Sequence, residues 1–275
     1  MPDEDFASFA ALVERGQAEV MVELAVEAEP VAGGWMTFGG RGAFVNKACG
    51  LGLEGEVPAE SAERIRTFFR DWQVEPTVEI CPFVHPTLLE ALAEAGFQLH
   101  AFENVLVRPL DPAEDLRRAL SHPWPEGVVI DRIDASEPAQ VETYVRVSSS
   151  GFFAAGTEMS DSFFRMSLKA AGLPGADCFV ARVGGEVVGA AGCANRQGVT
   201  SLYGASVLPA FRRRGIQQAL IAARLERGAQ RGSRRATIVS HPGIPTERNA
   251  ARLGFRMAYT RSVLVCPGAG PVRPP

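Results

Sequence analysis

The sequence has no long apolar run and few of the side chains that bind metals. No uninterrupted apolar stretch of the 275 residues reaches the length of a membrane span, and the acidic N-terminus lacks the apolar core of a signal peptide. The five cysteines form no C-x-x-C pair, and the four histidines show no H-E-x-x-H spacing. These absences predict a cytoplasmic protein with reduced cysteines, no membrane partner and no metal.

An excess of positive charge is also missing. The chain has 28 Lys and Arg against 32 Asp and Glu, a net charge of −4, so we expect no bulk binding of nucleic acid. Any basic patch must be local. Hydrophobic residues make up 46% and charged residues 22%, which is ordinary for globular proteins, and the length predicts about two domains.

The spacing of apolar residues and the positions of glycine and proline predict the order of elements. The first half reads as helix 5–14, strands 31–38 and 42–49, helix 59–72, strand 77–81, helix 86–95 and strand 98–107. The second half reads as strand 128–133, helices 138–148 and 161–170, strands 178–183, 187–194 and 200–207, helix 216–229, strand 236–240, helix 246–253 and strand 256–265. Antiparallel hairpins followed by strand–helix alternation predict an α/β (α+β) fold with mixed sheets.

Two stretches of the chain resemble each other. Residues 95–109 and 253–267 both pass through Gly-Phe into a long strand, which fits a glycine helix cap followed by a strand. The N-terminal half therefore looks like a partial copy of the C-terminal half. We expect domains at 1–110 and 128–267, a linker at 111–127 that is rich in proline and charge, and a disordered tail at 268–275.

The clearest functional signal is a run of three arginines before a glycine, between a predicted strand and a predicted helix. A helix N-terminus is already partly positive, so each cation there costs roughly a few tenths of a kcal/mol. A bound phosphate would reverse that sign, because it accepts the free N–H groups and pairs with guanidinium groups. Gly215 lets the backbone approach the anion. The alternative interpretation is a solvated basic turn.

The motif Arg212-Arg213-Arg214-Gly215-Ile216-Gln217 resembles the R/Q-x-x-G-x-G/A signature of the GNAT acetyltransferases, with Gln217 where that family usually has Gly or Ala. A second stretch, Asn249-Ala250-Ala251-Arg252-Leu253-Gly254-Phe255, is similar to the family's closing helix. The resemblance implies two GNAT-like mixed, mostly antiparallel sheets flanked by helices, in a tandem arrangement with a degenerate N-terminal copy.

The resemblance also implies an N-acetyltransferase that moves an acetyl group from acetyl-CoA to a primary amine on a small molecule or peptide. The protein would be a monomer or homodimer. The arginine loop would hold the pyrophosphate, and the last helix would flank the pantetheine arm, although Thr246 fits a helix N-cap equally well. The predicted cofactor-binding residues are Val207, Arg212, Arg213, Arg214, Gly215, Ile216, Gln217, Thr246 and Asn249.

The catalytic residues are less clear. The position of the family's usual general-acid tyrosine holds Ala250, so that role is absent or filled elsewhere. The candidates for the base that takes a proton from the amine are Tyr203, His241 or a chain of water molecules. His241, Tyr203 and Glu158 are also candidates for lining the acceptor pocket. Each is open to a packing or surface role instead. The backbone N–H near Val207 would polarise the thioester carbonyl.

Other functions stay open. The chain could be a non-catalytic regulator that binds acyl-CoA. It could also be a nucleic-acid module that uses the arginine loop together with Arg224, Arg227, Arg231, Arg234 and Arg235, although no aromatic residues are interleaved for stacking. Gly50-Leu51-Gly52-Leu53-Glu54-Gly55 matches G-x-G-x-x-G, but residues 56–58 separate its last glycine from any helix, which argues against a dinucleotide site.

Overall fold

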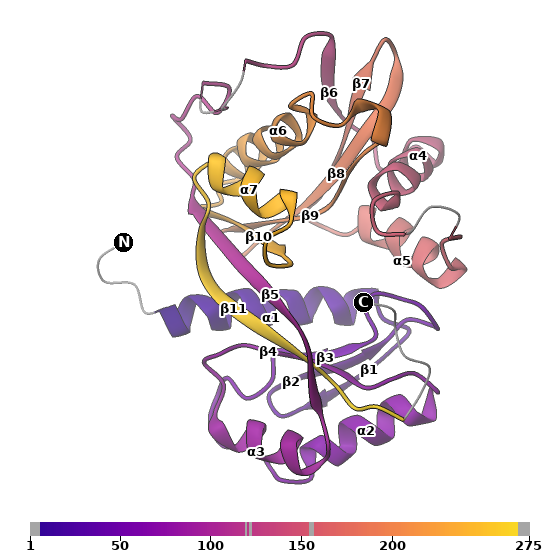
Figure 1. Cartoon of the computed structure of the whole chain (residues 1–275), viewed down its shortest axis with the longest axis vertical. Helices are drawn as coiled ribbons and strands as arrows, with labels where there is room; N and C mark the ends of the chain where they lie inside the picture. Colours follow the sequence, from indigo (N-terminus) through magenta and orange to yellow (C-terminus); the bar gives the residue numbers. More distant parts are fainter. Residues whose placement is uncertain (1–5, 119, 121–122, 154–156, 269–275) are drawn as a thin grey trace. The chain divides into compact units, whose positions relative to one another are not determined.

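The chain folds into two compact units, one formed by residues 1–104 and 258–275 and the other by residues 105–257. The structure, a computed structural model, describes residues 6–118, 120, 123–153 and 157–268 (Figure 1). Two long strands, β5 (Gln98–Pro109) and β11 (Arg256–Val265), contribute residues to both units and are neighbours in the sheet. The units therefore do not follow the ranges 1–110 and 128–267, because the segment from Ala258 onward packs with the N-terminal residues.

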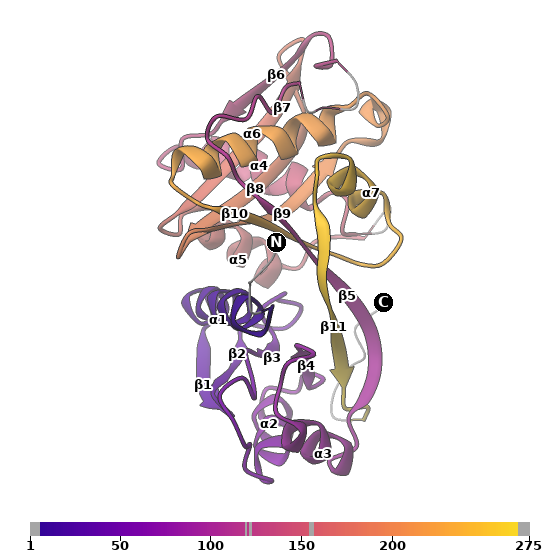
Figure 2. The same ribbon diagram turned by 90° about the vertical axis from the view of Figure 1, so that its left-hand side faces the viewer.

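The first unit contains a sheet with helices on both faces. Its elements are α1 (Phe6–Leu24), β1 (Glu27–Val31), β2 (Gly34–Phe38), β3 (Lys47–Cys49), α2 (Ser61–Asp71), β4 (Thr77–Ile80) and α3 (Pro86–Glu94). The strand order is β1-β2-β3-β4-β11-β5. Strands β3 and β4 are parallel, whereas the pairs β1–β2, β2–β3 and β4–β11 are antiparallel. Helices α2 and α3 share one apolar core with the sheet, and α1 lies on the opposite face (Figures 1 and 2).

Three predicted elements of this unit are wrong in detail. The helix predicted at 5–14 continues for ten more residues, to the end of α1 at Leu24. The single strand predicted at 31–38 is a hairpin, because Ala32 and Gly33 both take positive φ and turn the chain between β1 and β2. The strand predicted at 42–49 is reduced to β3. The side chain of Asn46 accepts from the N–H of Gly39 at 2.9 Å and donates to the carbonyl of Gly40 at 2.8 Å, which holds the preceding residues in a loop.

The second unit contains a sheet of order β5-β10-β9-β8-β7-β6. Its further elements are β6 (Val128–Arg132), α4 (Pro138–Ser149), α5 (Asp161–Ala171), β7 (Ala176–Val183), β8 (Glu186–Arg196), β9 (Val199–Val207), the 3-10 turn η1 (Pro209–Phe211), α6 (Ile216–Gln230), β10 (Arg235–Ser240) and α7 (Pro245–Arg252). Strands β9 and β10 are parallel, whereas the pairs β6–β7, β7–β8 and β8–β9 are antiparallel. The predicted α/β fold with mixed, mostly antiparallel strands flanked by helices is confirmed.

Separate apolar cores cover the two faces of this second sheet. Helix α6 packs on one face through Ile216, Leu220 and Leu225, and α4 packs on the other through Val141 and Val145. The described part of segment 111–127 is attached to the α6 side. Its Leu116 is buried in that core, and the Trp124 indole donates to the Val128 carbonyl at 3.0 Å. The tail expected at 268–275 lies, apart from Gly268, outside the described residues.

The described residues offer neither a membrane-spanning helix nor a metal-binding cluster. None of the described helices is long and apolar enough to cross a membrane. Within the described ranges, no group of three or more His, Cys, Asp or Glu side chains could hold a metal ion. All five cysteines are buried and free of disulfides.

Candidate acyl-CoA site

Strand β9 separates from β10 halfway along its length. The parallel pairing runs from Val199 and Arg235 to Leu202 and Ile238, although β9 continues to Val207. On the other side of β9 the register with β8 shifts, so that Ala190 faces Ser206 but Gly192 faces Tyr203. A β-bulge of this kind bends and twists the strand that carries the extra residue. Beyond Leu202, one edge of β9 therefore has no partner strand among the described residues.

This unpaired edge presents the backbone N–H of Val207. The N–H of Leu208 donates to the carbonyl of Val188 at 2.9 Å, so these two residues form a hydrogen-bonded pair between β8 and the end of β9. Polar groups alternate in direction along an antiparallel pair, so the N–H of Val207 points away from β8, toward the side where β10 no longer pairs. The position expected to polarise a thioester carbonyl thus carries an available donor.

The arginine loop ends in a helix whose first N–H groups are unpaired. After η1 the chain passes through two left-handed residues, Arg213 with φ 62° and Gly215 with φ 78°, and Gly215 is the N-cap of α6. Within the first turn of this helix, the N–H of Ala219 donates to the carbonyl of Gly215 at 3.1 Å. Across the described residues, no protein acceptor receives the N–H groups of Arg213, Arg214, Gly215, Ile216 and Gln217. These are the free donors that an anion at a helix N-terminus accepts.

The three arginines of the loop are exposed, and in the described part of the chain none forms an ion pair. Arg212 donates from Nε to the Val207 carbonyl at 3.0 Å. Arg214 donates to the Ala210 carbonyl at 3.3 Å, and its guanidinium lies 5.1 Å from the centre of the Phe211 ring. Unneutralised guanidinium groups beside a positive helix end are mutually unfavourable without an anion. The arrangement therefore fits a phosphate group.

Gln217 joins the two helices that border the site. Its amide donates to the Thr246 hydroxyl at 3.2 Å and accepts from the Asn249 amide at 2.6 Å, which connects α6 to α7. The structure thus brings together three predicted cofactor-binding residues, in contact with one another. Thr246 is not the helix N-cap, since Ile244 occupies that position and Pro245 begins the helix. The long side chain of Gln217 can reach α7, which Gly or Ala at this position could not do.

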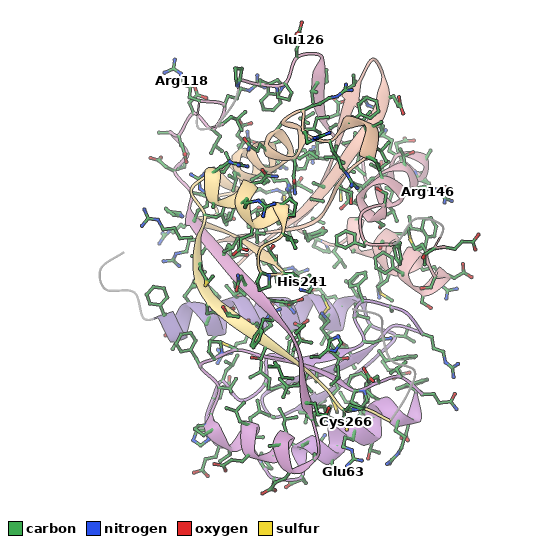
Figure 3. All side chains as sticks on the ribbon, in the orientation of Figure 1. Glu63, Arg118, Glu126, Arg146, His241 and Cys266 are labelled. Carbon is green, nitrogen blue, oxygen red and sulfur yellow. The ribbon has the colours of Figure 1, made fainter. Side chains whose placement is uncertain are left out.

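The two candidate catalytic residues differ in environment. Tyr203 packs against Gly192, and burial raises the pKa of its hydroxyl well above the ordinary value of 10. Among the described residues its hydroxyl has no hydrogen-bond partner. His241 is exposed, one residue beyond the end of β10 (Figure 3). The described residues show no hydrogen bond between the two, and Glu158 is exposed between α4 and α5.

The sequence analysis missed Arg224 as a site residue. This side chain is 2% exposed and donates to the carbonyls of Gly192 and Tyr203 at the bulge. A signal was available, because Arg224 follows Leu220 by four residues and so occupies the buried stripe of the helix. Arg227 and Arg231, from the same basic set, both pair with the buried carboxylate of Asp177.

Comparisons with known proteins show what family and fold the chain resembles. Residues 141–255 match the model of the acetyltransferase (GNAT) family, a range that lies within the second unit. A GCN5-related N-acetyltransferase from Kribbella flavida has the same fold with a TM-score of 0.69 and 19% identity, over 94% of this chain and 96% of that one. A tandem GNAT protein from the clavulanic acid biosynthesis pathway has a TM-score of 0.56 and 19% identity, over 78% of this chain and 69% of that one. No curated protein sequence matches the chain.

The predicted resemblance to the GNAT family is confirmed for the matched residues, and the GNAT fold is confirmed for most of the chain. The degenerate character of the N-terminal half stays a prediction.

Proposed function

We propose that the protein transfers an acetyl group from acetyl-CoA to a primary amine. One observation carries this proposal. A helix N-terminus with unpaired N–H groups, and three arginines that form no ion pair with the described residues, lie directly after a strand whose edge has no partner strand there. Both features fall inside the residues that match the acetyltransferase family. The donors suit the charge of a pyrophosphate, and Gly215 leaves room for it beside the backbone.

The residues would divide the task of binding coenzyme A. Arg212, Arg213 and Arg214 would pair with phosphate oxygens, which would also accept the free N–H groups of Gly215, Ile216 and Gln217. The hydroxyl group of Thr246 and the amide group of Asn249 would contact the pantetheine arm. The Val207 N–H would donate to the thioester carbonyl, where negative charge develops as the amine attacks.

The transfer forms a C–N bond, breaks the C–S bond, and moves one proton from the amine to the departing thiolate. Burial keeps Tyr203 as a neutral phenol, so it can give a proton but cannot serve as a base near neutral pH. We assign it the role of general acid, in place of the tyrosine that Ala250 replaces. The proton of the amine would pass to His241 or to water.

A screen of small-molecule and peptide amines with acetyl-CoA, read by release of free thiol, tests this function. At least one amine should accelerate thiol release, and Tyr203→Phe should lower kcat while the Kd of coenzyme A stays within about twofold. Thiol release at the same rate in Tyr203→Phe would refute the acid role. Absence of coenzyme A binding would refute the function itself.

The second candidate is a regulator that binds acyl-CoA without turnover. It is favoured by one observation, namely that no described residue forms a hydrogen bond with the hydroxyl of Tyr203. It predicts that acetyl-CoA binds and that no amine releases thiol. A nucleic-acid function is less well supported, because Arg227 and Arg231 are occupied by Asp177.

A further inference from the structure

Arg224 is a buried cation that has no acidic partner in the described structure. Its Nε donates to the Leu220 carbonyl at 2.9 Å, and its Nη1 donates to the carbonyls of Gly192 at 3.1 Å and Tyr203 at 3.4 Å. Burial lowers its pKa to about 10, which still leaves it charged at neutral pH. A buried charge that meets only carbonyl groups is costly compared with an apolar side chain of the same size. Stability alone does not account for it.

The two carbonyls that share Nη1 lie at the bulge. Gly192 on β8 faces Tyr203 on β9, and directly beyond this pair Ala191 is opposed by both Gly204 and Ala205. Gly204 takes a left-handed φ of 56°, as a bulged residue can. The guanidinium therefore joins β8 to β9 where their ladder is interrupted, through hydrogen bonds that its charge strengthens.

The same helix carries the arginine loop at its N-terminus. Gly215 and Arg224 are nine positions apart, about 14 Å along a helix. One rigid element thus links the free N–H groups that suit phosphate to the bulge that presents Tyr203 and Val207. The positive charge of Arg224 lowers the pKa of Tyr203 and so opposes the effect of burial, which raises it. The phenol is therefore a stronger acid than burial alone would leave it.

We propose that Arg224 is a positioning residue for acyl transfer, which holds the β9 bulge so that Tyr203 and the Val207 N–H face the acyl group. This inference rests on the proposed acyltransferase function. It separates two properties of the site. Binding of coenzyme A depends on the loop and the helix N-terminus, whereas recognition of the acyl group and its transfer depend on the bulge.

The test replaces Arg224 and leaves the loop unchanged. Arg224→Met should lower kcat about 100-fold, the usual effect of losing an oriented oxyanion donor, while the Kd of coenzyme A stays within about twofold. The Arg224→Met variant should also bind acetyl-CoA no more tightly than coenzyme A, because the Val207 N–H would no longer be held in position to donate to the acetyl carbonyl. Arg224→Lys should recover part of kcat, because an ammonium can still donate to one of the two carbonyls. Leu225→Met is the matched control, since it alters the same core without touching the bulge.

Hydrogen exchange gives a readout that does not depend on turnover. The amides of residues 204–207 should exchange faster in Arg224→Met than in wild type or Leu225→Met. If folded Arg224→Met keeps kcat within about threefold of wild type, the positioning role is wrong and the proposed function stands. If Arg224→Met does not fold, the Arg224→Lys variant decides, since unchanged kcat and unchanged exchange at 204–207 in it would overturn the inference. If wild-type protein binds no coenzyme A, the proposed function fails and this inference fails with it.

Discussion

Both units contain a strand, a loop, a helix and a second, parallel strand in the same order, but the two loops carry opposite charges. In the second unit, β9 leads through the arginine loop into α6 and then into the parallel strand β10. In the first unit, β3 leads through a glycine-rich loop into α2 and then into the parallel strand β4. Here the loop carries Glu54, Glu56 and Glu60 in place of arginines. Shared topology therefore does not determine anion binding, because the charges on the loop differ in sign. The common order supports the hypothesis that the first unit is a degenerate copy.

The interior of the first unit differs as well. Arg261 of β11 is 1% exposed and donates to the carboxylates of Glu14 and Glu79, both at 2.9 Å, while Lys47 of β3 pairs with Glu79. The Tyr259 hydroxyl donates to Glu14 at 2.6 Å. We call this set the carboxylate network. These side chains occupy the region beside β3 and β4 and pair with one another, so we infer that this region stabilises the unit and does not bind a ligand.

The glycine-rich loop also lacks the geometry of a dinucleotide site. Helix α2 begins only at Ser61, six positions after Gly55, and the strands before the loop pair antiparallel in a meander. A dinucleotide fingerprint requires the last glycine to open the helix that follows a parallel strand. This agrees with the interpretation made from the sequence.

Of the substitutions considered, one that breaks the carboxylate network should have the largest effect on the free energy of unfolding. Arg261→Met would leave Glu14 and Glu79 buried with fewer partners, and removal of one partner from a buried ion pair costs about 3–5 kcal/mol. We expect a loss of free energy of unfolding in that range, measured by urea denaturation. Arg66→Met, which removes an exposed pair with Glu63, is the control and should cost less than about 1 kcal/mol. Equal effects of the two variants would show that the network contributes no stability.

Acid should weaken the first unit through Glu79. Burial alone would raise the pKa of this carboxyl, but Lys47 and Arg261 outweigh it and lower the pKa to about 2, against 4.5 in the unfolded chain. The folded pKa is the lower one, so the stabilisation is complete above about pH 4.5 and is lost as pH falls toward 2. The loss should amount to about 3 kcal/mol. Glu79→Gln should flatten the slope of unfolding free energy against pH in this window. An unchanged slope would contradict the assignment.

A smaller effect, on kcat, is expected from substituting Gly192, on which the ring of Tyr203 packs. A methyl group built on Gly192 would lie 2.6 Å from the Tyr203 ring and 2.4 Å from the Tyr144 hydroxyl, so Gly192→Ala must displace one of them. We expect kcat to fall about tenfold, equivalent to about 1.4 kcal/mol, with unchanged affinity for coenzyme A. In the double-mutant cycle with Tyr203→Phe the two effects should not add. Full additivity would mean that Gly192→Ala acts independently of Tyr203.

The smallest effect is expected from reversing the charge of the glycine-rich loop in the first unit, which should not change the number of coenzyme A molecules bound. Glu54→Arg with Glu56→Arg gives this loop a positive charge but leaves the carboxylate network in place. Calorimetry should still find one molecule of coenzyme A per chain. A stoichiometry of two would show that loop charge is sufficient and that the filled interior is irrelevant.

The sequence predicted the parts of the site that depend on neighbouring residues. The arginine loop, its helix and the order of strands follow from local spacing, and Gly215 does take the left-handed conformation that glycine favours. The role of Gln217 depends on α7, which follows about thirty residues later, so local pattern could not reveal it. The burial of Arg224 could be predicted from its place on the apolar stripe of the helix, but its acceptors could not, because they belong to the bulge between β8 and β9.

The carboxylate network was beyond sequence reasoning. Its members come from α1, β3, β4 and β11, and Glu14 and Arg261 are separated by 247 positions. Each of these charges alone would be assigned to the surface. Only the pairing of β11 with β4 shows that they meet.

The central claim is that the arginine loop of the second unit binds coenzyme A, and two glutamate substitutions test it most directly. Gly215 and Gly232 lie at opposite ends of α6 with nearly equal φ of 78° and 79°, and a side chain at either has no close contact. Strain should therefore be similar, at about 1 kcal/mol or more in each.

Calorimetric titration of coenzyme A into the folded variants should give Gly232→Glu the affinity of wild type. Gly215→Glu should weaken binding by about 100-fold, because its charge repels phosphate and removes charge-assisted hydrogen bonds. Equal affinity in Gly215→Glu, Gly232→Glu and wild type would show that the loop is a solvated basic turn and contradict the account.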